Sequence, residues 1–140
     1  MEFVEGRIEE DKMFGDVVFP KTLLPSNSCT ANLAETVRKK RDILAKMLQQ
    51  HGAILFRGFH VDSPKAFDHV VQAFGWEHLD YFGGNERVRV TDRVYSVNEA
   101  PPEQFINFHH EMALVSIAFP ATIYLPNNDS VIGLFSLHIL

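Results

Sequence analysis

Residues 51–59 read HGAILFRGF, and this stretch sets the fold of the surrounding chain. The apolar run Ala53 to Phe56 is short, with Gly52 before it and Arg57-Gly58 after it, which is typical of a buried strand. Gly52 lies where a left-handed residue ends a preceding helix. The stretch therefore predicts a buried strand that begins directly after a helix and ends in Arg57-Gly58-Phe59.

Helices are predicted on both sides of this strand. From Ala31 to Gln50 the apolar residues recur at about 3.6-residue spacing, and Thr30 or Ser28 is available as the N-cap. After the strand, Asp62 or Ser63 caps a second helix with Pro64 in its first turn. Apolar residues line one face of that second helix, and a glycine ends it: Phe67, Val70, Val71, Phe74 and Gly75.

The remaining apolar runs have the character of strands. They are Phe3 to Ile8, Val17 to Phe19, Val88 to Val97, Phe105 to Val115 and Ile117 to Leu125. Two helices accompanied by several extended runs predict an α+β fold, with the helices packed on a mostly antiparallel sheet.

Composition narrows the classes of function. The net charge of −5 provides no global basic field, so we expect no nucleic-acid partner, and the basic run at 39–41 is interpreted as the solvated face of its helix. Cys29 is the only cysteine, which excludes an internal disulfide. No run approaches the ~18 apolar residues that cross a bilayer, and the N-terminus lacks the layout of a secretory signal. A cytoplasmic protein without membrane contact is expected.

The segment FHHEMA at 108–113 concentrates potential metal ligands. In a strand, side chains two positions apart share a face, so His109 and Glu111 would converge while His110 points away. One imidazole and one carboxylate form two-thirds of a 2-His-1-carboxylate triad for Fe(II). A zinc helix of the H-E-x-x-H type fails because position 114 is Leu114. On spacing alone, the simpler interpretation that the two histidines fill polar positions of a strand is favoured.

The order of several motifs makes the iron interpretation more specific. HGAILFRGF is followed by an FDHVVQAFG helix at 67–75, YFGG at 81–84, NEAPP at 98–102 and FHHEMA at 108–113. Over about residues 3–120, this series resembles the clavaminate synthase-like branch of the TauD/TfdA-type Fe(II)/2-oxoglutarate-dependent dioxygenases. The resemblance implies that His109 and Glu111 bind Fe(II), with 2-oxoglutarate as cosubstrate, dioxygen and a small organic molecule as substrates, and no catalytic residues beyond these ligands. It also implies a partial double-stranded β-helix, or jelly roll, flanked by two N-terminal helices.

The resemblance ends near Pro120. Residues 1–120 are therefore expected to be the N-terminal part of a dioxygenase domain, and residues 121–140 a divergent tail of a chain that looks truncated. The tail has no recognisable distal histidine, since His138 lies in an unrelated context, and no cation for 2-oxoglutarate. The family's arginine is matched by none of four arginines: Arg57, Arg87, Arg89 and Arg93. The alternative prediction is a non-catalytic fragment that pairs with a full-length homologue.

Overall fold

The computed structural model describes residues 3–26, 32–78, 87–96, 101, 103, 105, 122–124 and 131–135. Within these residues the elements are β1 (Phe3–Gly6), β2 (Lys12–Phe14), β3 (Val17–Phe19), β4 (Lys21–Pro25), α1 (Leu33–His51), β5 (Ala53–Arg57), α2 (Pro64–Phe74), β6 (Thr122–Tyr124) and β7 (Val131–Phe135). The α+β class predicted from the sequence is confirmed. The described strands form a five-stranded and a two-stranded sheet, and they do not show a jelly roll.

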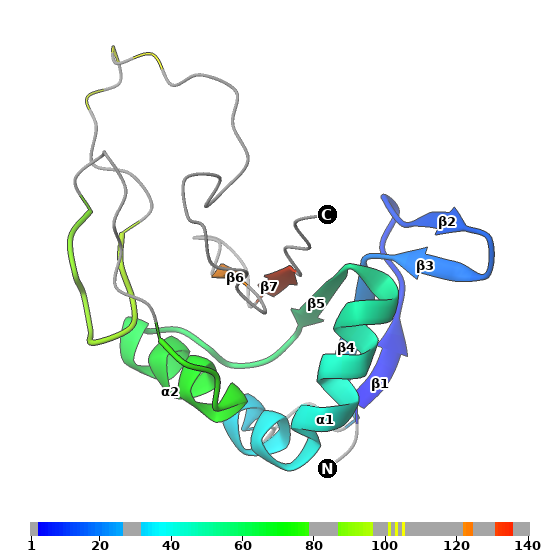
Figure 1. The fold of residues 1–140 in the computed structure, drawn as a ribbon, viewed down its shortest axis with the longest axis horizontal. Coiled ribbons are helices and arrows are strands. Elements are labelled where there is room, and N and C mark those ends of the chain that lie inside the picture. The colour runs from blue at the N-terminus through cyan, green and yellow to red at the C-terminus, as the bar shows by residue number, and fades with distance from the viewer. Residues whose placement is uncertain are drawn as a thin grey trace.

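The larger sheet has the strand order β1-β4-β5-β7-β6. Its β4–β5 pairing is parallel, and the β1–β4, β5–β7 and β6–β7 pairings are antiparallel. Parallel neighbours need a crossover connection, and α1 supplies it between β4 and β5. The strand predicted at Ala53 to Phe56 is β5, which is the central strand of the sheet (Figure 1).

Strand β7 lies within residues 121–140, which are predicted above to be a divergent tail. It pairs with β5 over five positions, from Ala53 opposite Phe135 to Arg57 opposite Val131. Part of residues 121–140 thus completes the sheet beside its central strand, and β6 extends the sheet by one more strand at the edge.

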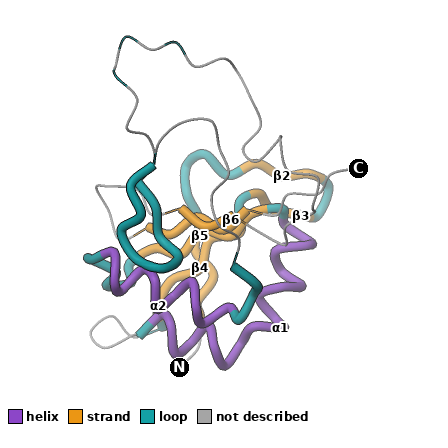
Figure 2. The backbone as a smooth tube through the Cα atoms, turned by 60° about the vertical axis from the view of Figure 1, so that its left-hand side comes forward, coloured by secondary structure: helices purple, strands orange, loops and turns teal. Residues whose placement is uncertain are grey.

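Helices α1 and α2 lie side by side on one side of the strands (Figure 2). The core between these layers is formed by buried residues from α1, α2, β4 and β5 and from the connection after β5: Leu23, Leu33, Val37, Leu44, Ile54, Phe56, Phe59, Val61, Phe67, Val70 and Phe74. Phe56 is fully buried, and its ring lies 5.6 Å from that of Phe3 and 6.5 Å from that of Phe74. Aromatic contacts at these distances hold β1 and α2 to the central strand.

Capping residues next to each helix determine where α1 and α2 begin and end. Ser63 Oγ accepts the backbone N–H of Ala66 at the start of α2, and Gly75 ends α2 with a left-handed φ of 69°. These two ends confirm the prediction. The N-cap of α1 was predicted wrongly, because Asn32 and not Thr30 or Ser28 accepts the N–H of Glu35. Asparagine caps a helix as well as serine does, and Asn32 stands directly before the first helical residue.

The interpretation of residues 88–97 as strands also needs correction. In the described part of this segment, the only strand-like pairing is an isolated bridge between Arg89 and Tyr95. A turn at Thr91 occupies the centre of the segment, because side-chain hydrogen bonds to the backbone compete there with strand pairing. The predicted strand at 105–115 lies largely outside the described residues. Of the predicted strand at 117–125, β6 is the described portion.

The hairpin of β2 and β3 stands beside the C-terminal end of α1 (Figure 1). His51, the last residue of α1, bonds through Nδ1 to the carbonyl oxygen of Val18 at 2.8 Å. A carbonyl oxygen only accepts, so Nδ1 carries the hydrogen and donates it. This bond fastens the hairpin to the helical layer.

A buried lysine lies at the start of β4, on the same face of the sheet as Leu23. Lys21 opens β4 and is only 8% exposed, and its Nζ lies 2.6 Å from a carboxylate oxygen of Glu5 in β1. The hydrogen bond and the charge of Lys21 hold the pKa of Glu5 below its ordinary value of 4.5. The pair therefore joins neighbouring strands β1 and β4 while keeping a buried ammonium compensated.

Candidate functional site

The predicted iron ligands His109 and Glu111 lie outside the described residues, as does His138. What the structure describes is the scaffold that leads to the predicted site: the central strand β5, the helix α2 and the segment 87–96. No group of three or more His, Cys, Asp or Glu side chains that could hold a metal occurs within that scaffold or elsewhere in the described residues.

Segment 87–96 is built around a threonine turn. Thr91 Oγ1 accepts the backbone N–H groups of Arg93 at 3.3 Å and of Val94 at 3.2 Å. The guanidinium of Arg89 donates to the carbonyl oxygen of Thr91 at 3.3 Å. Hydrogen bonds within the segment therefore stabilise its turn independently of contacts with the rest of the molecule.

A buried carboxylate on α2 holds this segment. Asp68 is 8% exposed; its Oδ2 accepts a hydrogen bond from Gln72, and its Oδ1 lies 3.8 Å from Nη1 of Arg93. Oδ1 has no hydrogen-bond partner among the described residues. The negative charge of Asp68 is therefore compensated there by the positive charge of Arg93. Val94 packs against the apolar core next to this ion pair.

Sequence reasoning missed Asp68. Its burial could have been predicted from its position, because it directly follows Phe67 on a helix whose buried face includes Phe67 and Val70. An acidic residue at such a position is buried with its neighbours and needs a cation nearby. Arg93, 25 positions along the chain, could not be assigned to it without the fold.

The arginines considered for 2-oxoglutarate occupy different environments. Arg57 is exposed at the end of β5, where it stands opposite Val131 of β7. Arg89 and Arg93 are engaged in the threonine turn and with Asp68. In the described structure these two side chains serve local architecture.

The sequence matches the family described as "Taurine catabolism dioxygenase TauD, TfdA family" over residues 22–125. This range covers about three-quarters of the chain and includes all but the first residue of β4, then α1, β5, α2 and the positions of His109 and Glu111. The chain belongs to the TauD/TfdA family. The resemblance inferred from the ordered motifs is thereby confirmed, and the match continues five residues past Pro120.

A curated relative supports the same branch of the family. The chain is 38% identical over 129 residues to "Clavaminate synthase-like protein At3g21360" of Arabidopsis thaliana, and the alignment covers 86% of this chain. It covers 39% of that relative, so the chain spans well under half of the relative's length. Separately, none of the helices in the described ranges is long and apolar enough to cross a membrane.

Proposed function

We propose that this chain forms the N-terminal part of an Fe(II)/2-oxoglutarate-dependent dioxygenase domain that oxidises a small organic substrate. The observation that carries the proposal is the family match over residues 22–125, because it includes the HHEM segment together with the elements that precede it. In the complete domain the sheet of the described structure would belong to a double-stranded β-helix, with α1 and α2 on its outside.

The proposed metal ligands are His109 and Glu111. A neutral imidazole and a carboxylate are ligands that suit Fe(II), and their spacing of two positions places them on one face of an extended segment. When bound, Fe(II) and 2-oxoglutarate would supply the activation of dioxygen that couples decarboxylation of 2-oxoglutarate, to succinate and CO₂, with oxidation of the substrate. The third iron ligand is not identified in this sequence.

The described scaffold would orient this half-site. Segment 87–96 precedes the metal-binding segment and is held to α2 by the Asp68–Arg93 ion pair and by Val94. Helix α2 is in turn held to β5 by the rings of Phe74 and Phe56. We therefore propose that these contacts fix the position of residue 96, from which the chain continues to the proposed metal ligands.

Binding of iron and cosubstrate tests the proposal directly. The chain is titrated with Fe(II) and 2-oxoglutarate without oxygen, and the weak visible charge-transfer band is recorded. We expect a band that is lost in His109→Ala and retained in the matched control His69→Ala, which removes an exposed histidine on α2. A band of equal intensity in wild type and His109→Ala would contradict the assignment of His109.

A second candidate function follows from the edges of the larger sheet. Among the described strands, β1 and β6 lie at its two edges, where backbone groups can pair with another chain. A non-catalytic role through pairing with a homologue is consistent with this arrangement. Co-elution of the two chains in size-exclusion chromatography is expected for this role, and two independent monomeric peaks would refute it.

A further inference from the structure

Strand β2 lies at an open edge of the two-stranded sheet. Among the described strands its only neighbour is β3, and Figures 1 and 2 show β3 between β2 and helix α1. The outer edge of β3 is occupied, because His51 of α1 donates a hydrogen bond to the carbonyl oxygen of Val18. The edge of β2 that faces away from β3 is therefore the side of this sheet that can accept another strand.

The backbone of Met13 provides hydrogen-bonding groups at that edge. Met13 stands opposite Val18 in the register of the hairpin. Because the carbonyl group of Val18 is directed to α1, the two residues form a pair without mutual hydrogen bonds. The N–H and C=O groups of Met13 therefore point away from β3, and they are the donor and the acceptor that an added antiparallel strand would use.

The side chains of β2 are apolar at two of its three positions, and both apolar side chains are exposed. Met13 is 54% exposed and Phe14 is 64% exposed. Side chains alternate between the two faces of the hairpin, so Met13 and Val18 share one face. Lys12, Phe14 and Phe19 share the other face, where the ring centroids of Phe14 and Phe19 lie 6.4 Å apart. An open edge that carries exposed apolar side chains favours pairing with another strand.

We propose that β2 is the interface of a homodimer, in which the β2 strands of two copies pair antiparallel about Met13. A two-fold axis then relates the two copies, and each copy makes the same contacts with the other. Two hairpins of two strands become one sheet of four strands, which is more stable than an isolated hairpin. This interface is independent of the proposed iron chemistry and of the edges of the larger sheet.

The sequence of β2 is complementary to itself in this arrangement. Met13 lies beside the partner's Met13, and with Val18 of each copy they form a continuous apolar row on one face. On the other face, Lys12 lies opposite the partner's Phe14, whose ring attracts the ammonium group. Asp16 follows Phe14 by two positions and brings an opposite charge near Lys12. Because no like charges stand opposite each other within the paired strands, this pattern favours a second copy as the occupant.

Sedimentation velocity of the full chain, at an ionic strength of about 0.15 M, tests the dimer. Because β2 has only three residues, the interface is small, and we expect a reversible equilibrium between monomer and dimer with a Kd of about 10–100 μM. Met13→Lys and Met13→Glu each bring like charges together at the two-fold axis, so each should raise the Kd at least about tenfold. An equimolar mixture of the two variants brings opposite charges together there and should restore the Kd to within about threefold of the wild-type value.

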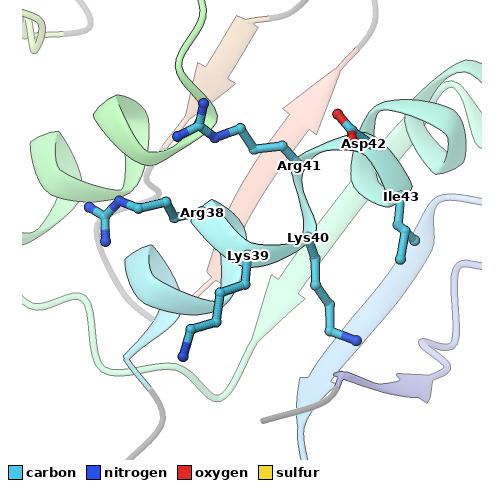
Figure 3. Close-up of a pocket in the computed structure, with 6 residues that line it drawn as sticks. All are labelled: Arg38, Lys39, Lys40, Arg41, Asp42 and Ile43. Carbon is cyan, nitrogen blue, oxygen red and sulfur yellow. The ribbon is translucent and has the colours of Figure 1, made fainter.

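Ile43 provides a matched control. It lies in the part of α1 that follows the kink at Lys40 (Figure 3), and its exposure of 51% is close to that of Met13. Ile43→Lys adds the same charge at an equally exposed apolar position outside β2. We expect it to change the Kd less than about twofold, which is typical of surface substitutions away from an interface.

Three results would overturn the proposal. The first is a folded chain that remains monomeric up to about 500 μM, well above the affinity expected of a small interface. The second is a weakening by Met13→Lys no greater than that by Ile43→Lys, which would place the contact outside β2. The third is a mixture of the two Met13 variants that associates no better than either variant alone, which would remove Met13 from the two-fold axis. Because Met13 is half exposed, both variants should retain the circular dichroism spectrum of the wild type.

Discussion

Replacement of Gly75 by alanine tests how α1 and α2 meet. Gly75 has φ at 69°, and an alanine in this left-handed region costs about 1–2 kcal/mol. The added methyl group would also displace the guanidinium of Arg41, which lies 2.5 Å from the Cβ position. A cation near a helix C-terminus contributes about 0.3–1 kcal/mol, so the total expected loss in the free energy of unfolding is about 1.3–3 kcal/mol.

Gly15 provides a matched control for the backbone part of this loss. It has φ at 61° in the β2–β3 turn, and no atom lies within 4 Å of its Cβ position. Gly15→Ala should therefore carry the left-handed cost alone, about 1–2 kcal/mol. Both substitutions reduce the entropy of the unfolded chain in the same way, so that effect cancels in the comparison.

Urea denaturation measures both variants. The fluorescence of Trp76, whose ring stacks on Phe74 at 4.7 Å, reports the end of α2, and circular dichroism reports the whole fold. In an Arg41→Ala background, the loss caused by Gly75→Ala should fall to that of Gly15→Ala. The reasoning is refuted if Gly75→Ala costs less than about 0.5 kcal/mol, or if Arg41→Ala leaves the difference between the two glycines unchanged.

Three further substitutions test the layers around the core. Glu5→Gln should slightly destabilise the protein at neutral pH. Because Lys21 lowers the pKa of Glu5 in the folded state, the carboxylate's contribution is present above its ordinary value of 4.5 and is lost as the pH falls through the lower folded value. The difference from wild type in pH-dependent urea denaturation should therefore shrink below about pH 4.5, and a constant difference would contradict the ion pair. His51→Phe removes the donor to Val18 and should cost about 0.5–1.5 kcal/mol while increasing proteolysis of the β2–β3 hairpin; unchanged cleavage there would count against the bond as its fastening. Phe56→Ala should cost about 3–5 kcal/mol by thermal or urea unfolding, because its ring is fully buried, and a loss below about 1 kcal/mol would show that the central strand is not the core strand.

The sequence predicted best where short-range chemistry determines an element. Ser63 and Pro64 at the start of α2 and Gly75 at its end required no knowledge of the fold, and the apolar run at 53–56 is long enough only for a strand. Strand β4 was missed because Pro20 and Pro25 stand at its ends and indicate breaks. Its pairing with β1 and β5 is a long-range property that no local pattern contains.

Charged residues inside the fold were the hardest to predict. Lys21 and Asp68 are buried because partners far along the chain, Glu5 and Arg93, compensate their charges. The kink at Lys40 has no proline or glycine to mark it. The assignment of His109 and Glu111 stays a prediction, since the family match includes their positions but the described structure does not.

Binding of Fe(II) and binding of 2-oxoglutarate would require different residues of this chain. Two ligands two positions apart are enough to begin an Fe(II) site, whereas 2-oxoglutarate also brings a distal carboxylate that is costly to bury without a cation. The sequence contains no lysine or arginine after Arg93, and Arg89 and Arg93 are already engaged in the turn and with Asp68. Arg57 is exposed at the end of the central strand, and its charge is therefore open to a ligand carboxylate. If Arg57 supplies the cation, Arg57→Gln should weaken 2-oxoglutarate binding and leave iron binding alone unchanged, and equal 2-oxoglutarate affinity in the two proteins would contradict that role.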